Sequence, residues 1–174
     1  MGEIRSVIEL GDGRLRSHAQ PVHPVDDPQL QRVIDDLLTT AAAKNGVGIA
    51  APQVALGLQL FIVASRPNLR YPQAPTMEPT AMINPHILSH SDDLVRGWEG
   101  CLSVPGRRGL VPRYREIEVA YQDRYGQVHR HYLQDFVARI FQHEYDHLQG
   151  MVFLDRIDDP RDILTEAEYQ QRFG

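Results

Sequence analysis

The segment from Asp135 to Gln149 constrains the fold most, because apolar and ionisable residues share one face of its predicted helix. Its apolar residues recur at helical spacing ahead of Gly150, a residue typical of helix ends: Phe136, Val137, Ile140, Phe141 and Leu148. His143, Glu144 and His147 fall on the same stripe. The other polar residues are expected on the opposite, solvent-facing side: Arg139, Gln142, Asp146 and Gln149. Two imidazoles and a carboxylate that face a core cost several kcal/mol unless they find a partner, so this helix is predicted to pack around a polar site.

The stretch from His143 to His147 reads HEYDH and matches the HExxH pattern. Residues four apart lie about one helical turn apart, so both imidazoles can bind one metal ion with Glu144 beside it. A five-residue match also arises by chance on a solvated helix face, but a position on the apolar face favours metal binding. We therefore expect a metal site on this helix.

Two histidines do not complete a metal site, and the third ligand decides the class of enzyme. A metzincin carries a further histidine after the motif, but Phe153 occupies that position here. Glu166 or Glu168 could complete a thermolysin-like site, although the polar segment around them offers little scaffold for a second helix. Cys101 is the remaining candidate, because a thiolate with two imidazoles suits zinc or ferrous iron. A lone cysteine is ordinarily a buried small hydrophobe, but the sequence EGCLS around Cys101 is glycine-flanked and loop-like.

Length and composition indicate one globular domain over residues 1–174, in which residues 158–174 form a surface tail, either a short helix or a frayed end. The chain has 174 residues, a formal net charge of −5 and one cysteine. A single cysteine excludes an intramolecular disulfide and favours a reducing compartment. Residues 1–25 lack the apolar core of a secretory signal, and no apolar run approaches the ~18 residues of a membrane span. We therefore expect a soluble, cytoplasmic protein.

The other patterns predict one more long helix and several strands. Acidic residues and a proline at 26–28 favour a helix start, and Asn45-Gly46 favours its end. Strands are predicted at 58–64 and 81–84, and a hairpin is predicted at 116–122 and 128–133. The four prolines of residues 65–79 predict an exposed loop that could vary without harm to the core.

A third motif, GVGIAAPQ from Gly46 to Gln53, resembles a dinucleotide-binding fingerprint only superficially. That fingerprint follows a strand and opens a helix, whereas this stretch follows a predicted helix. Gly46 and Gly48 instead allow an extended substrate backbone to approach closely. Gln53 adds an amide donor of the kind that stabilises an oxyanion.

The motifs GVGIAAPQ, EGCLS and HEYDHL occur in this order, and together they closely resemble the peptide deformylase family. The resemblance extends from the first predicted helix to about Ile157. It implies an α+β fold of a single domain, with antiparallel or mixed β-sheets packed around a central helix that bears HExxH, and with an N-terminal helix. It also implies hydrolysis of the N-formyl group from the formylmethionine of new polypeptides, with release of formate.

The resemblance also implies a role for each motif residue. The metal ligands are Cys101, His143 and His147, the general base is Glu144, and the oxyanion donors are Gln53 and the backbone N–H of Leu102. One divalent ion per chain is implied, Fe²⁺ in the cell, with Zn²⁺, Ni²⁺ or Co²⁺ as substitutes. A bound metal can lower the pKa of water from 15.7 to about 7, and a carboxylate such as Glu144 then takes the proton and passes it to the departing amine.

The expected substrate-binding residues lie within or near the three motifs: Gly46, Val47, Gly48, Glu99, Gly100, Arg108, Phe136 and Ile140. Four apolar residues are candidates for the pocket of the methionine side chain, and ordinary core packing explains them as well: Val47, Leu102, Phe136 and Ile140. Glu99 and Arg113 could form a supporting ion pair. Arg108 could lie at the pocket rim, although a solvated surface position accounts equally for Arg108 and Arg107.

The implied partners are nascent formylmethionine polypeptides and, transiently, the ribosome. The segment 158–162 is not basic, which disfavours a ribosomal contact there. The acidic net charge predicts no direct nucleic-acid partner, and no membrane partner is expected. The bacterial cytosol is the implied location, and the oligomeric state stays open.

Three other functions remain open on the sequence alone. A zinc endopeptidase shares HExxH but cuts internal peptide bonds. A cysteine hydrolase would use Cys101 and His143, but it leaves Glu144 and His147 unexplained. A structural metal module that binds peptides needs a fourth protein ligand to close the site.

Overall fold

The structure is a computed structural model that describes all 174 residues. Its helices and strands are α1 (Pro28–Ala43), β1 (Gly48–Ala50), β2 (Leu60–Val63), β3 (Thr80–His90), β4 (Leu94–Cys101), β5 (Val104–Tyr114), β6 (Glu116–Gln122), β7 (Val128–Gln134), α2 (Asp135–Leu148), β8 (Ile163–Thr165) and α3 (Glu166–Phe173). Short 3₁₀ turns lie at Gly13–Arg16, Ala51–Val54, Phe153–Arg156 and Pro160–Asp162.

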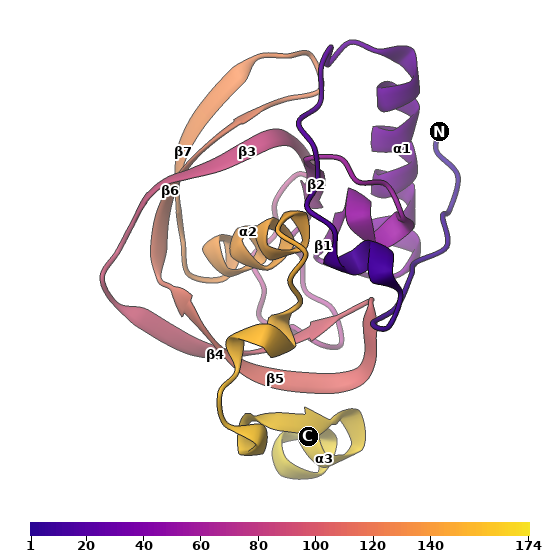
Figure 1. The fold of residues 1–174 in the computed structure, drawn as a ribbon. Coiled ribbons are helices and arrows are strands. Elements are labelled where there is room, and N and C mark those ends of the chain that lie inside the picture. Colours follow the sequence, from indigo (N-terminus) through magenta and orange to yellow (C-terminus); the bar gives the residue numbers. More distant parts are fainter.

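The strands form two antiparallel sheets with a helix between them. One sheet has five strands in the order β1-β2-β3-β6-β7, and the other has three in the order β4-β5-β8. Helix α2 lies at the centre, α1 covers the outside of β1 and β2, and α3 lies beyond β5 (Figure 1). The predicted α+β fold around the HExxH helix is therefore confirmed. None of the helices combines the length and the apolar character needed to cross a membrane.

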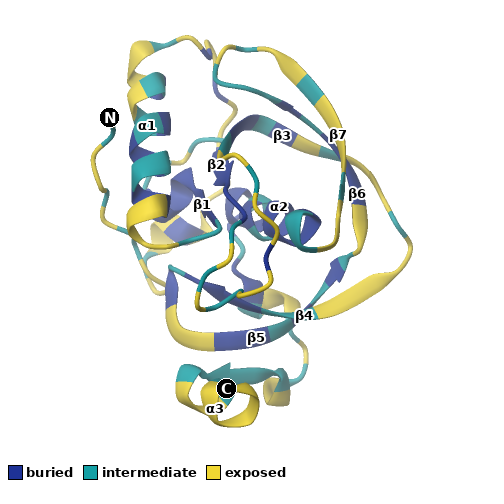
Figure 2. Ribbon diagram, turned by 180° about the vertical axis from the view of Figure 1, so that it is seen from behind, coloured by how far each residue is buried: buried dark blue, intermediate teal, exposed yellow.

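Strand β2 shows how the five-stranded sheet divides the core. Leu60 and Ile62 pack in a cluster with α1, whereas Phe61 and Val63 pack in a cluster with α2. Successive side chains of a strand point to opposite faces, so one fully buried strand serves both layers. Buried residues gather on β1, β2 and α2, whereas β7 and α3 are largely exposed (Figure 2). Strand β2 thus separates the cluster next to α1 from the cluster next to α2.

The predicted first helix and hairpin are both present. Helix α1 begins at Pro28, and the Asp27 carboxylate caps it by accepting a hydrogen bond of 2.9 Å from the Leu30 N–H. The helix ends shortly before Asn45, whose φ of 55° lies in the left-handed region that asparagine tolerates. Strands β6 and β7 pair antiparallel, as the alternating pattern predicts.

The prediction of a solvent-facing side for α2 is wrong. Arg139, Gln142 and Asp146 are only 9%, 6% and 3% exposed. The Gln142 side chain bonds both the N–H and the C=O of Tyr114 on β5, at 3.0 and 2.9 Å. These polar residues can be buried because groups of the second sheet satisfy them, and the sequence pattern does not contain those distant partners.

Two further expectations are corrected. Cys101 is the last residue of β4 rather than part of a loop, at the turn that leads into β5. The 65–79 loop is not wholly exposed, since Ser65 and Ala74 are buried. Of the two alternatives for residues 158–174, the structure has the short surface helix, α3. The unexpected strand β8 precedes it and pairs with β5, with Leu164 opposite Arg108.

Candidate metal centre

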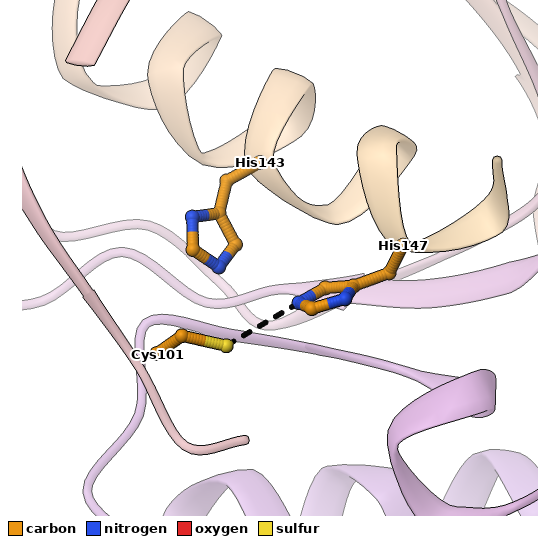
Figure 3. Close-up of side chains that lie close together, drawn as sticks. All are labelled: Cys101, His143 and His147. Carbon is orange, nitrogen blue, oxygen red and sulfur yellow. Dashed lines mark hydrogen bonds between the residues drawn. The ribbon is translucent and has the colours of Figure 1, made fainter. Parts of the chain in front are cut away.

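Helix α2 and the end of β4 bring three metal-binding side chains together. Cys101, His143 and His147 each offer one ligand atom, and these atoms all lie within 4.8 Å of one another. The Cys101 Sγ lies 3.4 Å from Nε2 of His147, and both imidazoles point from α2 toward the thiol (Figure 3). The exposed fraction is 3% for Cys101 and zero for His147. The structure thus forms the triad that the motifs predict.

A buried carboxylate orients His143. Its Nδ1 hydrogen-bonds Glu99 Oε1 at 2.8 Å, which leaves Nε2 as the ring nitrogen for a metal. Glu99 also accepts two hydrogen bonds from Arg113, at 2.9 and 3.0 Å, and one from Arg139 at 2.6 Å. Burial alone would raise the pKa of Glu99, but Arg113 and His143 hold it well below its ordinary value. Glu99 therefore stays ionised and fixes the imidazole.

The donor atoms of the centre fit a cation. Oε2 of Glu144 is buried without a hydrogen-bond partner, and Nε2 of His147 faces the Cys101 thiol while its Nδ1, also unpartnered, faces away. Burial lowers the pKa of His147 well below its ordinary value, so the imidazole stays in the neutral form that binds metals. A thiolate and two imidazoles that leave a position open are the donor set expected for zinc or ferrous iron.

Glu144 lies beside the triad in a place that only a glycine leaves free. A Cβ on Gly48 would lie 2.7 Å from Glu144 Oε1 and 3.0 Å from the Ile62 carbonyl oxygen. Gly48 therefore lets strand β1 pack against the carboxylate. Burial raises the pKa of Glu144 to about 7, a value at which a carboxylate exchanges protons readily near neutral pH.

Gln53 faces the thiol from the turn after β1. Its Oε1 accepts a hydrogen bond of 2.9 Å from the Ala50 N–H, which fixes the direction of the amide. Its Nε2 lies 3.5 Å from Cys101 Sγ and 3.1 Å from Ser103 Oγ. The amide donor therefore points at the centre.

A cavity of about 510 Å³ opens onto the triad. Every residue that the sequence predicts for the site lines it except His147, which is buried beneath: Gly46, Val47, Gly48, Gln53, Glu99, Gly100, Cys101, Leu102, Arg108, Phe136, Ile140, His143 and Glu144. The helical face formed by Phe136, Ile140 and His143 runs along one wall, because these positions are four and three residues apart. The cavity thus joins the triad to apolar residues one and two turns away.

The predicted pair of Glu99 and Arg113 is present, and it belongs to a longer buried chain. Arg113 also donates to Asp146 at 2.6 Å, and Asp146 accepts from Arg156 at 2.7 Å. Arg108, in contrast to a solvated surface arginine, is 2% exposed and donates to Glu166 at 2.8 Å. Arg107 is exposed, as expected.

Several residues of the cavity wall lie outside the motifs, and the sequence patterns do not predict them. Arg70 and Tyr71 come from the 65–79 loop, and Glu166 and Gln170 come from α3. The Tyr71 hydroxyl accepts a hydrogen bond of 3.0 Å from the Gly100 N–H. The capping box of Thr165 and Glu168 signals the start of α3 in the sequence, but nothing local indicates that its side chains reach the cavity.

Comparison with known proteins gives a consistent result. A family model described as polypeptide deformylase matches residues 4–162. Peptide deformylase 2 of Nostoc sp. is 59% identical, over 97% of this chain and 94% of that protein. Peptide deformylase 1 of Bordetella pertussis is 47% identical, over 97% and 93% of the two chains.

Solved structures of similar sequence share the fold. The Met-Ala-Ser-bound class I type b peptide deformylase of Acinetobacter baumannii has a TM-score of 0.87 and 43% identity, and the match covers 90% of this chain and all of that one. The actinonin complex of a peptide deformylase from Synechococcus elongatus has a TM-score of 0.79 and 37% identity, with 91% and 81% coverage.

Proposed function

Since this chain belongs to the polypeptide deformylase family and is a metal-dependent enzyme that removes the N-formyl group from nascent polypeptides, we propose how its own residues perform the reaction. Cys101, His143 and His147 hold one divalent metal ion. The observation that carries this proposal is the cluster of their ligand atoms within 4.8 Å of one another beside Glu144. We assign Fe²⁺ as the ion in the cell and Zn²⁺, Ni²⁺ or Co²⁺ as substitutes.

A metal ion held by these three ligands would act as a Lewis acid that lowers the pKa of water toward neutral pH. The protein's part is to keep the ligands in their binding forms. The hydrogen bond from His143 Nδ1 to Glu99 fixes the ring, and burial keeps His147 neutral. Metal analysis of anaerobically prepared protein tests the identity of the ion, because Zn²⁺ competes strongly for the same ligands at equal availability.

Glu144 moves the proton. Its unpartnered Oε2 accepts a proton from the attacking water and returns it to the nitrogen of the departing amine. A pKa of about 7 suits both halves of this transfer. The surrounding burial excludes bulk water that would compete for the carboxylate.

Gln53 and Leu102 stabilise the charge that develops on the formyl oxygen. The Gln53 amide is held by its bond from Ala50, so its Nε2 donates to the oxygen without reorientation. The Leu102 backbone N–H, next to Cys101, is the second donor. Fixed donors at a buried oxyanion each contribute about 10²- to 10³-fold in rate.

The shape of the cavity orients the substrate. The formyl group reaches the triad, the main chain runs beside Gly46 and Gly48, and the methionine side chain extends along α2 toward Ile140 and Phe136. Residues 1–174 act as one catalytic domain. The enzyme acts on nascent chains in the bacterial cytosol, where a reduced Cys101 thiol persists, and it meets the ribosome transiently.

A formate-release assay tests the function. We expect metal-loaded protein to release formate from formylmethionine peptides. It should not cleave blocked peptides that lack a formyl group. Cleavage of only the blocked peptides would indicate an endopeptidase instead. Activity that survives complete metal removal by a chelator would point to a cysteine hydrolase.

A further inference from the structure

Two basic side chains in the cavity wall have no role in the reaction proposed above, Lys44 and Arg70. Lys44 is exposed and marks the open end, whereas Cys101 and Glu144 are buried. Arg70 is half-buried and lies deeper, because a Cβ on Gly100 would lie 2.9 Å from its guanidinium carbon. Neither side chain forms an ion pair within the protein, although the charge of Arg70 helps to lower the pKa of Glu166.

A third cation of the cavity wall, Arg108, is already compensated. Arg108 donates to Glu166 through Nε and Nη2, at 2.8 and 3.1 Å. Its guanidinium lies 4.3 Å from the centre of the Tyr169 ring, and its Nη1 donates to the Arg70 carbonyl at 3.5 Å. Arg108 thus joins the 65–79 loop to α3, and Glu166 cancels its charge. Glu166 lies beyond residue 162, where the family match ends.

The path of the substrate runs past these charges. The formyl group must reach the buried triad, and a nascent chain is far longer than the cavity. An extended chain advances ~3.3 Å per residue. The residues that directly follow methionine therefore leave through the open end, which the exposed Lys44 and Leu69 line.

We propose that Lys44 and Arg70 give the enzyme a preference for formylmethionine peptides with an acidic residue among positions two to four, and that Glu166 limits this preference by neutralising Arg108. The chain as a whole is acidic, with a net charge of −5, so the attraction is local. Charges within a Debye length of ~8 Å at physiological salt carry it. This inference rests on the deformylase reaction proposed above and names its preferred substrates.

The test compares peptides that differ in one charge. The probes are amidated formyl-Met tetrapeptides with Glu, Gln or Lys at position two, three or four and Ala elsewhere; amidation removes the terminal carboxylate. We expect the ratio of kcat/KM for Glu over Lys to be about two- to fivefold at one of these positions, as for exposed charge pairs. High salt should reduce this ratio, whereas a purely steric preference would not respond.

Two variants shift the preference in opposite directions. Arg70→Gln removes an unpaired cation and should bring the Glu-over-Lys ratio toward one. Glu166→Gln frees the charge of Arg108 and should raise the ratio above that of the wild type. Arg107→Gln is the matched control, because Arg107 is exposed on the same strand as Arg108 and does not line the cavity.

The outcomes separate this inference from the proposed reaction. Absence of formate release from every peptide would reject the reaction itself. Turnover with a ratio of one at all three positions would overturn the charge preference alone. A ratio that stays unchanged in both Arg70→Gln and Glu166→Gln would also overturn it. Arg70→Gln remains informative if Glu166→Gln unfolds, because the Arg70 guanidinium has no ion pair to lose.

Discussion

The two ends of the cavity are built on different principles. At the inner end, charged residues are buried and paired, and Arg113 between Glu99 and Asp146 is 3% exposed. At the outer end, Glu166 pairs with Arg108 but its side chain is 43% exposed, and Lys44 is exposed without an ion pair. Catalysis needs charged groups that are fixed in a low dielectric, and the inner end provides them. Substrate preference can use exposed charges, although solvent and salt weaken their attraction.

The largest loss in free energy of unfolding is expected from a substitution at the inner end. Arg113→Met leaves Glu99 and Asp146 buried with fewer partners, and removing one member of a buried ion pair costs about 3–5 kcal/mol. Urea denaturation of the metal-loaded protein measures the loss in free energy of unfolding. The control is Arg115→Met, because Arg115 meets Asp135 at 3.4 Å with both side chains more than half exposed, and such a pair contributes less than about 1 kcal/mol. Equal losses in the two variants would show that burial does not set the difference.

A smaller effect is expected where β1 meets Glu144. In Gly48→Ala, the new Cβ would lie 2.7 Å from Glu144 Oε1 and 3.0 Å from a backbone oxygen, so the carboxylate must shift. Misplacement by about 1 Å can cost ~10²-fold in rate. We expect kcat for formate release to fall by about this factor while the metal content is kept.

Gly57→Ala is the matched control for that substitution, because nothing lies within 4 Å of a Cβ at Gly57. It should leave kcat unchanged. If the Gly48→Ala enzyme were as fast as the Gly57→Ala enzyme, the close packing of β1 against Glu144 would not be needed for the rate.

The smallest effect concerns the outer end. The hydrogen bonds from Arg108 lower the pKa of Glu166 below its ordinary value of 4.5. The stabilisation is therefore complete above the unfolded-state pKa, and it is lost as the pH falls through the lower folded-state pKa. For a half-exposed carboxylate it amounts to less than about 1 kcal/mol.

Trp98 reports this loss, since it is the only tryptophan and its ring centroid lies 5.4 Å from those of Tyr169 and Phe173 on α3. We expect its emission to shift to the red below pH 4.5, before the far-ultraviolet dichroism changes. Glu166→Gln should abolish that separate step. Coincident transitions in the wild type would show that α3 does not detach on its own.

The sequence predicts the residues that local spacing brings together, but not those that contacts between distant segments bring together. His143, Glu144 and His147 are found from local spacing on one helix, and Cys101 is found from its short motif. The predicted solvent-facing positions of Arg139 and Asp146 are wrong because their partners, Glu99 and Arg113, come from a sheet far away in the sequence. Tyr71 and Glu166 reach the cavity through tertiary packing alone, and no local periodicity encodes that packing.

The central claim is that Glu144 transfers the proton in a site whose metal is held by Cys101, His143 and His147. The most direct test measures metal content and formate release on the same sample of Glu144→Ala. The account predicts one metal ion per chain, as in the wild type, and a rate lower by about 10²- to 10⁴-fold, the usual contribution of a general base. Turnover near the wild-type rate in a metal-replete Glu144→Ala sample would contradict it.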